Sequence, residues 1–297
     1  MRASPSAGCW GPASLTAVAG VVATLFAGAC HPAGRAGASA ASVPVTGEVV
    51  TFPSGGLTLR GVLHKPDGPG PFPAILYNHG SVGGMLSLTA ANALGPVFVA
   101  HGWVFFMPCR RGQGLSAGAG PYIMDEIATA RRAGGPAAAS ARMVQLLATD
   151  HLDDQLAGLA WLRARDFVQP GRIAVGGNSF GGIETVLGAE RGPYCAAVDS
   201  AGGAASWAGS PELRAVMLRA VRSAPVPIFF FQAANDYDLA PSHVLSAARK
   251  DAGKPFDVKI YPAFGSSADE GHRLGYFGSA VWADDVFRFL DAHCAPP

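Results

Sequence analysis

The sequence has few charged residues and no marked excess of either sign. Charged side chains make up 14% of its 297 residues, and the formal net charge is +1. No Lys- or Arg-rich run stands out, although binding to the phosphates of nucleic acid depends on such clusters. His64, His101, His151, His243 and His293 show no pairing at metal-ligand spacing and are expected at the surface or at helix ends. We therefore expect neither a nucleic-acid partner nor a metal site.

No hydrophobic run is long enough to serve as a permanent transmembrane anchor. The longest, residues 15–29, holds about 15 residues, whereas a spanning helix needs about 20. Arg2 is the only charge before it, and small residues follow it, which is typical of a secretory signal peptide. Residues 31–45 are rich in Gly, Ala, Ser and Pro, as flexible tethers are. We predict that residues 1–44 are a signal peptide and tether of an exported protein, and that residues 45–297 form a single domain.

Cysteine is scarce, with five in the whole chain. Cys30 directly follows small residues, and the stretch resembles the lipidation site of bacterial lipoproteins, although Ala27 stands where those usually have Leu. The alternatives are thus a lipid anchor at Cys30 or simple cleavage of the signal peptide. Ordinary export leaves Cys109, Cys195 and Cys294, which allow one disulfide with one thiol left over. The sequence does not decide which pair forms.

Strand-like and helix-like segments alternate from residue 72 onward. An antiparallel hairpin is expected before them, at residues 48–52 and 57–64, around a Pro-Ser-Gly-Gly turn. The expected strands are 72–77, 103–107, 173–175, 195–198, 227–231 and 256–261, and the expected helices are 89–101, 142–165, 183–190, 211–221, 241–250 and 279–293. Such alternation predicts an α/β fold with a mostly parallel sheet and helices on both faces. No internal repeat is evident.

Three groups of residues have no assigned chemistry. Residues 115–139 are rich in Gly and Ala and poor in periodicity, so they are interpreted as a mobile flap or as a solvated connection. Asp153 and Asp154 are expected on a solvated helix face. Arg110 and Arg111 follow a strand and could bind a substrate carboxylate, but a structural role in their loop is the favoured interpretation.

The stretch 172–184 carries the clearest chemical signal. A buried strand ends at Gly176 and Gly177, Ser179 follows, and a helix begins after Gly181. Strand, sharp turn with a serine at its tip, then helix is the context of a nucleophile elbow. The residues two before and two after the serine must be small because the two backbones nearly touch there. Ser179 is therefore the candidate nucleophile.

The Gly-x-Ser-x-Gly pattern by itself is weak evidence, because in a chain this rich in Gly and Ser it arises by chance about one time in three. A second copy, residues 114–118, is indeed present. It is separated from the preceding strand, and Gly118, Gly120 and Pro121 do not permit a helix directly after it. We interpret Ser116 as a loop residue.

A serine nucleophile needs a base and an acid that orients the base, in the order Ser, Asp, His on this type of sheet. The loop after strand 227–231 offers Asp236, and the loop after the last strand offers His272. Asp238, or Asp199 after the preceding strand, is the alternative acid. His79 is expected to shape its loop and not to act as a base.

Together these segments resemble the dienelactone hydrolase family of α/β-hydrolases, which is related to the catalytic domains of prolyl-oligopeptidase-type enzymes. The resemblance covers the chain from about residue 45 onward and rests on five motifs: Asn78-His-Gly80, Arg111-Gly-Gln-Gly-Leu-Ser116, Gly177-Asn-Ser-Phe-Gly181, Asn235-Asp236 with Pro241 downstream, and Glu270-Gly-His272. It implies Ser179 as nucleophile, Asp236 as acid and His272 as base. The archetypal members carry cysteine at the elbow, and the serine-bearing relatives are commonly general esterases.

The expected reaction is hydrolysis of a small carboxylic ester through an acyl-enzyme, without cofactor. The oxyanion is expected to meet the backbone N–H of Phe180 and that of Ser81. A peptidase or amidase is the close alternative. A non-catalytic binding protein on the same fold is the alternative from another class. The sequence leaves the physiological substrate and the oligomeric state open.

Overall fold

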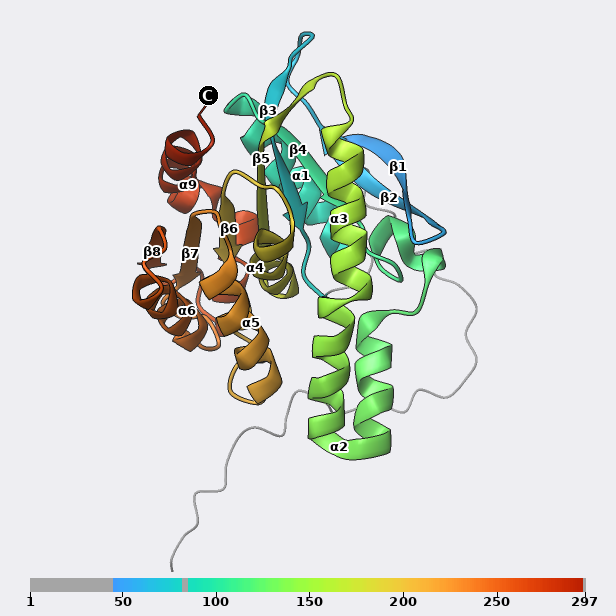
Figure 1. Ribbon diagram of the computed structural model, residues 1–297, viewed down its shortest axis with the longest axis vertical. Helices are drawn as coiled ribbons and strands as arrows, with labels where there is room; N and C mark the ends of the chain where they lie inside the picture. Colours follow the sequence, from blue (N-terminus) through green and yellow to red (C-terminus); the bar gives the residue numbers. More distant parts are fainter. Residues whose placement is uncertain (1–44, 82–84, 296–297) are drawn as a thin grey trace, which may run out of the picture. The chain divides into compact units, whose positions relative to one another are not determined.

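The structure is a computed structural model that describes residues 45–81 and 85–295 (Figure 1). The expected signal peptide and tether, and with them Cys30, lie outside the described residues. Within the ranges that are described, no helix is long and apolar enough to cross a membrane.

Eight strands form one mixed sheet in the order β1-β2-β4-β3-β5-β6-β7-β8. They are β1 (Glu48–Ser54), β2 (Leu57–His64), β3 (Phe72–Asn78), β4 (Val104–Pro108), β5 (Val168–Asn178), β6 (Ala197–Ser200), β7 (Ile228–Ala233) and β8 (Phe256–Tyr261). The hairpin β1–β2 is antiparallel and β2 also pairs antiparallel with β4, whereas β4, β3 and β5 to β8 run parallel. The predicted mostly parallel sheet with an N-terminal antiparallel hairpin is thus confirmed.

Helices cover both faces of this sheet. They are α1 (Met85–Ala100), α2 (Ile123–Ala148), α3 (Asp150–Arg163), α4 (Phe180–Arg191), α5 (Pro211–Ser223), α6 (Ala240–Asp251), α7 (Ala268–His272), α8 (Leu274–Phe277) and α9 (Ser279–His293), with a short 3₁₀ helix η1 (Gly114–Ala119). Helices α1, α8 and α9 pack on one face, and α2 to α6 pack on the other. Successive strand residues face opposite layers. Phe229 and Phe230, for example, belong to different cores.

Residues 115–139 are mostly helical, which the sequence did not predict, and the side chains of residues 129–137 are mostly exposed. They belong to η1 and to α2, which folds back on itself at Gly134 and Gly135 (Figure 1). Gly135 has φ +74°, which favours glycine, and Pro136 begins the returning arm. Alanine is the strongest helix former but is small on every side, so an Ala-rich helix shows little hydrophobic periodicity.

Two polar residues expected at the surface are buried. Asp154 is 1% exposed and accepts hydrogen bonds from the Ser54 hydroxyl and from the Arg111 side chain. His151 is also 1% exposed, and burial together with two nearby arginines lowers its pKa to about 3. Asp154 thus faces β1 and the loop after β4, and His151 Nδ1 lies 3.8 Å from the buried Glu184 Oε1. The periodicity of the α3 sequence does not show these partners, because they are distant in the chain.

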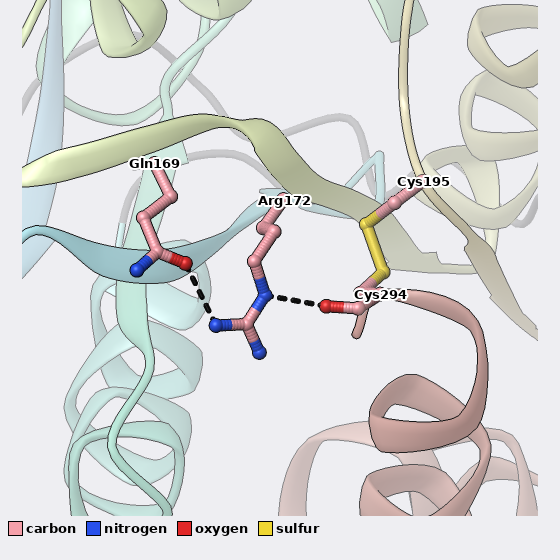
Figure 2. Close-up of a disulfide and its surroundings, with 4 residues drawn as sticks. All are labelled: Gln169, Arg172, Cys195 and Cys294. Atoms are coloured by element: carbon pink, nitrogen blue, oxygen red, sulfur yellow. Dashed lines mark hydrogen bonds between the residues drawn. A yellow bond between two sulfur atoms is a disulfide. The ribbon is translucent and has the colours of Figure 1, made fainter. Parts of the chain in front are cut away.

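A disulfide links the C-terminal helix to the sheet. Cys195, just before β6, bonds to Cys294 at the end of α9, and Cys109 is left as a buried free thiol. Figure 2 shows Arg172 beside this bond: its Nε donates to the Cys294 carbonyl at 2.5 Å, and its Nη1 donates to Gln169 Oε1 at 2.7 Å. Strand β5, which carries Arg172, is thus joined to the same helix end.

Candidate active site

Ser179 lies in the turn between β5 and α4, with φ +63° and ψ −122°. A non-glycine residue rarely adopts such a conformation, so the surrounding structure has to impose it. A Cβ on Gly177 would overlap the carbonyl group of Gly181, and a Cβ on Gly181 would overlap the carbonyl oxygen of Asn78. The strand, the helix and the neighbouring strand meet too closely there for any side chain. This is the geometry of a nucleophile elbow.

The structure brings the three candidate side chains into direct contact. His272 Nε2 lies 2.9 Å from Ser179 Oγ, and His272 Nδ1 lies 2.8 Å from Asp236 Oδ1. Ser179 follows β5, Asp236 follows β7 and His272 belongs to α7, which follows β8. All three therefore stand at the carboxyl ends of parallel strands. A hydrogen bond from Nδ1 to the carboxylate leaves the lone pair of Nε2 directed at the serine hydroxyl.

The Asp236 carboxylate is held by two further donors. Gln232 Nε2 donates to Oδ2 at 2.8 Å, and the backbone N–H of Tyr237 donates to Oδ1 at 2.7 Å. The alternative acids contact other groups. Asp238 Oδ1 accepts from the backbone N–H of Ala240 at the start of α6, and Asp199 Oδ1 accepts from that of Gly202. Among these carboxylates, Asp236 is the one that contacts the imidazole.

The loop after β3 runs beside the nucleophile. A Cβ built on Gly80 would lie 3.4 Å from the Cβ of Ser179. The N–H of Gly80 itself is directed elsewhere, since it donates to the Tyr276 hydroxyl at 2.6 Å. The next amide of this loop is that of Ser81. Phe180 is the first residue of α4, where backbone N–H groups have no partner within the helix. An oxyanion site formed by the N–H groups of Ser81 and Phe180 stays a prediction.

A buried polar cluster lies behind this loop. Arg110 is 2% exposed and Glu184 0% exposed, and they form an ion pair with 2.5 Å between Nη1 and Oε2. Burial raises the pKa of Glu184 to about 7, although Arg110 opposes the rise. Arg111 is bound to Asp154 by two side-chain hydrogen bonds. Both arginines are thus committed to carboxylates of the protein, which is the structural role favoured from the sequence.

Sequence reasoning does not find three side chains that support the triad. They are Gln232 on the acid, Tyr237, whose ring lies 4.8 Å from that of His272, and Tyr276 on the loop after β3. The one sequence signal for Gln232 is that its amide side chain follows the apolar residues of β7. No local signal marks Tyr276, because its contact with Gly80 joins residues far apart in the chain.

No group of three or more His, Cys, Asp or Glu side chains is placed to hold a metal ion in the part of the chain that the structure describes. Ser116, in the second Gly-x-Ser-x-Gly copy, is buried in η1. Its Oγ accepts from the backbone N–H of Arg60 at 2.9 Å. This serine is therefore engaged in joining η1 to β2.

Comparison with known proteins agrees with this fold. The family model described as "Dienelactone hydrolase family" matches residues 59–283. A search of curated proteins found no match. Among solved structures, the chain is similar to one assigned as a dienelactone hydrolase from Klebsiella pneumoniae. The TM-score is 0.60 at 17% identity, with 84% of this chain and 98% of that chain covered.

Two peptidases have similar folds over part of their length. Pyrococcus horikoshii acylaminoacyl peptidase gives a TM-score of 0.59 at 18% identity, covering 83% of this chain and 41% of that one. Porphyromonas gingivalis dipeptidyl peptidase 4 gives 0.57 at 18% identity, covering 83% and 35%. The chain therefore spans less than half the length of these peptidases. At such identities the likeness shows the α/β-hydrolase fold.

Proposed function

The chain belongs to the dienelactone hydrolase family of α/β-hydrolases, and on that premise we propose that it cleaves carboxylic esters through an acyl-enzyme formed on Ser179. The observation that carries the proposal is the position of His272, within hydrogen-bond distance of both the Ser179 hydroxyl and the Asp236 carboxylate. Family membership supports a hydrolase. The preference for esters rests on the serine at the elbow.

The proposed first half-reaction transfers the acyl group. His272 Nε2 takes the proton of the Ser179 hydroxyl while Oγ attacks the ester carbonyl carbon, and the carbonyl electron pair moves to oxygen. The N–H groups of Phe180 and Ser81 would stabilise this oxyanion. When the carbon–oxygen bond to the alcohol breaks, His272 returns the proton to the leaving oxygen.

In the second half-reaction water takes the place of the alcohol. His272 accepts a proton from water as it attacks the acyl carbon, and then returns the proton to Ser179 Oγ as the acid leaves. Asp236 holds the imidazole in the tautomer that both steps require and stabilises its protonated form. The protein needs no cofactor for this sequence of steps.

Peptide or amide hydrolysis is the second candidate. The acylaminoacyl peptidase and dipeptidyl peptidase 4 named above favour it, because they share the fold with this chain. An amine is a poorer leaving group than an alcohol, so the same residues would act on amides only with tighter control of the protonated His272. A panel of p-nitrophenyl esters of graded acyl length, assayed beside one peptide anilide, separates the two candidates.

Replacing the nucleophile tests the proposal directly. We expect Ser179→Ala to abolish turnover of p-nitrophenyl esters and labelling by a fluorophosphonate, with the fold retained. The matched control is Ser116→Ala in the second copy of the motif, which costs about 1 kcal/mol through the lost bond to Arg60 but keeps turnover. Undiminished turnover in Ser179→Ala would refute the assignment. A wild-type protein that neither turns over esters nor reacts with the probe would favour a binding protein.

We also propose that the protein works outside the cytoplasm, with an ester as its small-molecule partner. The disulfide between Cys195 and Cys294 supports this location, because disulfides persist in oxidising compartments. The expected signal peptide agrees with it, and lipidation of Cys30 would add membrane attachment. If Cys30 is lipidated, Cys30→Ser should release the protein from the membrane fraction. An unchanged fraction would exclude the anchor.

A further inference from the structure

The carbonyl group of Gly80 receives three buried hydrogen bonds, the longest of them from Gln113 Nε2 at 3.5 Å. Arg110 Nη2 donates to it at 2.7 Å, and His79 Nδ1 lies 2.8 Å from it. His79 and Arg110 are 1% and 2% exposed. A backbone carbonyl in a loop usually has one partner or water. The orientation of the peptide between Gly80 and Ser81 is therefore strongly fixed.

The protonation of His79 follows from its neighbours. Its Nε2 accepts the backbone N–H of Arg110 at 3.2 Å, so the ring proton is on Nδ1. Burial, and next the Arg110 charge, hold the pKa of His79 well below its ordinary value, so the ring is neutral. The neutral ring thus donates Nδ1–H to the Gly80 carbonyl. His79 and Arg110 share this acceptor.

Arg110 is itself held on three sides. Its Nη1 donates to Glu184 Oε2, its Nε donates to Gln113 Oε1 at 3.1 Å, and its Nη2 donates to Gly80. Glu184 lies on α4, the helix that begins directly after Ser179. A planar guanidinium with three nitrogens bound has one orientation. The ion pair therefore couples the loop after β3 to the helix of the nucleophile.

We propose that Arg110 is a positioning residue of the oxyanion site, an inference that rests on the function proposed above. In a trans peptide the C=O and the following N–H point in opposite directions. When Arg110 holds the Gly80 carbonyl toward the buried side of the loop, the N–H of Ser81 turns toward the side on which Ser179 lies. The N–H of Gly80 cannot stabilise the oxyanion instead, because it donates to the Tyr276 hydroxyl.

The positive charge of Arg110 has a second effect on the peptide between Gly80 and Ser81. A hydrogen bond from a guanidinium polarises the peptide it reaches, which makes the N–H at the other end a stronger donor. The Ser81 carbonyl is fixed as well, by Gln113 Nε2 at 3.0 Å and by the Tyr122 hydroxyl at 2.6 Å. Both peptides that flank the Ser81 Cα atom are thus anchored by the loop that follows β4. Arg110 would act through Ser81 and would not touch the substrate.

The test is a double variant, Arg110→Met with Glu184→Gln, which removes the ion pair without leaving an unpaired buried charge. We expect kcat for a p-nitrophenyl ester to fall about 10- to 100-fold with KM within about threefold, because one oxyanion donor is worth about 10²–10³. The inhibition constant of a trifluoromethyl ketone should rise by a similar factor. The matched control, Arg111→Met with Asp154→Asn, removes the neighbouring pair of the same loop and should change kcat by less than about threefold.

A folded Arg110→Met/Glu184→Gln protein with wild-type kcat and wild-type ketone affinity would overturn the inference. Should that protein not fold, Arg110→Lys decides. Lysine keeps the charge beside Glu184 but lacks the rigid fork whose separate nitrogens reach the carboxylate, the Gly80 carbonyl and Gln113. We expect it to lose kcat while its melting temperature stays near that of the wild type. A lysine variant with full kcat would show that Arg110 only stabilises the fold. Failure of the proposed function looks different, since the wild type would then lack turnover.

Discussion

The Asp236 carboxylate shows why one of three nearby acids suits the triad. Both of its oxygens are hydrogen-bonded, one to Gln232 and the other to Tyr237 and His272, so its plane faces the imidazole. Asp238 stands two residues later in the same loop, but its carboxylate accepts from the backbone N–H of Ala240. The choice between these two acids depends on a few ångströms of loop geometry. The spacing of residues in the sequence does not contain that information.

The two acids can be separated by mutation. We expect Asp236→Asn to lower kcat by about 10³–10⁴, because the amide favours the wrong tautomer of His272 while the packing is kept. Asp238→Asn removes a charge that accepts from the backbone N–H of Ala240 at the start of α6, and should cost about 1 kcal/mol of stability with kcat nearly unchanged. Ester kinetics and urea unfolding of both variants measure this. The reverse order of kcat losses would move the acid role to Asp238.

Asp199 gives a prediction for pH. It is 3% exposed, and burial raises its pKa from 3.8 to about 7, with the Gly202 N–H opposing the rise. A raised carboxyl pKa means that the folded state binds the proton more tightly than the unfolded state. The stability that this contributes is complete below about pH 4 and is lost as the pH rises to about 7.

Asp199→Asn keeps an acceptor for Gly202 but does not titrate. Relative to the wild type, its free energy of unfolding should therefore increase between pH 4 and pH 7, by up to about 4 kcal/mol. Urea unfolding of both proteins at four pH values across this range is the measurement. Glu184, whose pKa burial also raises to about 7, is present in both proteins, so its titration cancels in the difference. Parallel pH profiles would contradict the shift.

At the scale of elements, the turn from β5 to α4 depends on how closely the neighbouring strand β3 approaches it. The same five-residue motif occurs twice, and in its second copy it forms η1, away from any strand end. Gly181 has the carbonyl oxygen of Asn78 where a Cβ would stand, whereas Gly118 has open space around it. The close backbone contact therefore requires glycine only in the copy at residues 177–181.

Alanine scanning of the two copies tests that difference. We expect Gly181→Ala to cost about 3 kcal/mol or more, because its Cβ meets backbone atoms of β3 that cannot move aside. Gly118→Ala should stay within about 0.5 kcal/mol of the wild type. Chemical unfolding of the two variants gives both numbers. Equal stabilities would mean that β3 can move away from the elbow at little cost in free energy.

The elements themselves were largely predictable, and the exceptions have physical causes. Strands β5 and β7 contain short apolar runs, residues 173–175 and 228–231, with Gly or Pro close by, so their place in a parallel sheet follows from pattern and order. The first arm of α2 and its turn did not follow, because alanine hides the face that is buried. The buried state of Asp154 and His151 on α3 did not follow either, because it depends on contacts with Ser54, Arg111 and Glu184, which are distant in the sequence.

At the scale of the whole molecule, sheet order brings the site together. Strands β5, β6, β7 and β8 are successive neighbours, so the loops that carry Ser179, Asp236 and His272 lie along one edge. The convergence of these three loops could be predicted because parallel strands end at a common edge. The network of Arg110, Glu184 and His79 could not be, since it joins β3, β4 and α4 through side chains that no local pattern links.

The disulfide lies away from this edge. Cys195 precedes β6, so it stands at the amino end of the strands, and its N–H donates to the carbonyl of Ile173 in β5. Its partner Cys294 ends α9, 99 residues later in the chain. A cross-link over so long a loop restricts the unfolded chain strongly. The bond should therefore contribute to stability with little effect on the chemistry at the opposite edge.

Removing the bond tests this separation. We expect the double variant Cys195→Ser/Cys294→Ser to lose about 2–5 kcal/mol of unfolding free energy while kcat for an ester stays within about twofold of the wild type. Urea unfolding with and without a reducing agent provides an internal control, because the reductant should destabilise the wild type and leave the variant unchanged. Arg172 would still hold the end of α9 through the Cys294 carbonyl, which limits the disturbance to that corner (Figure 2). A large loss of kcat in a folded variant would mean instead that α9 transmits strain to α8 and so to Tyr276, which holds the N–H of Gly80.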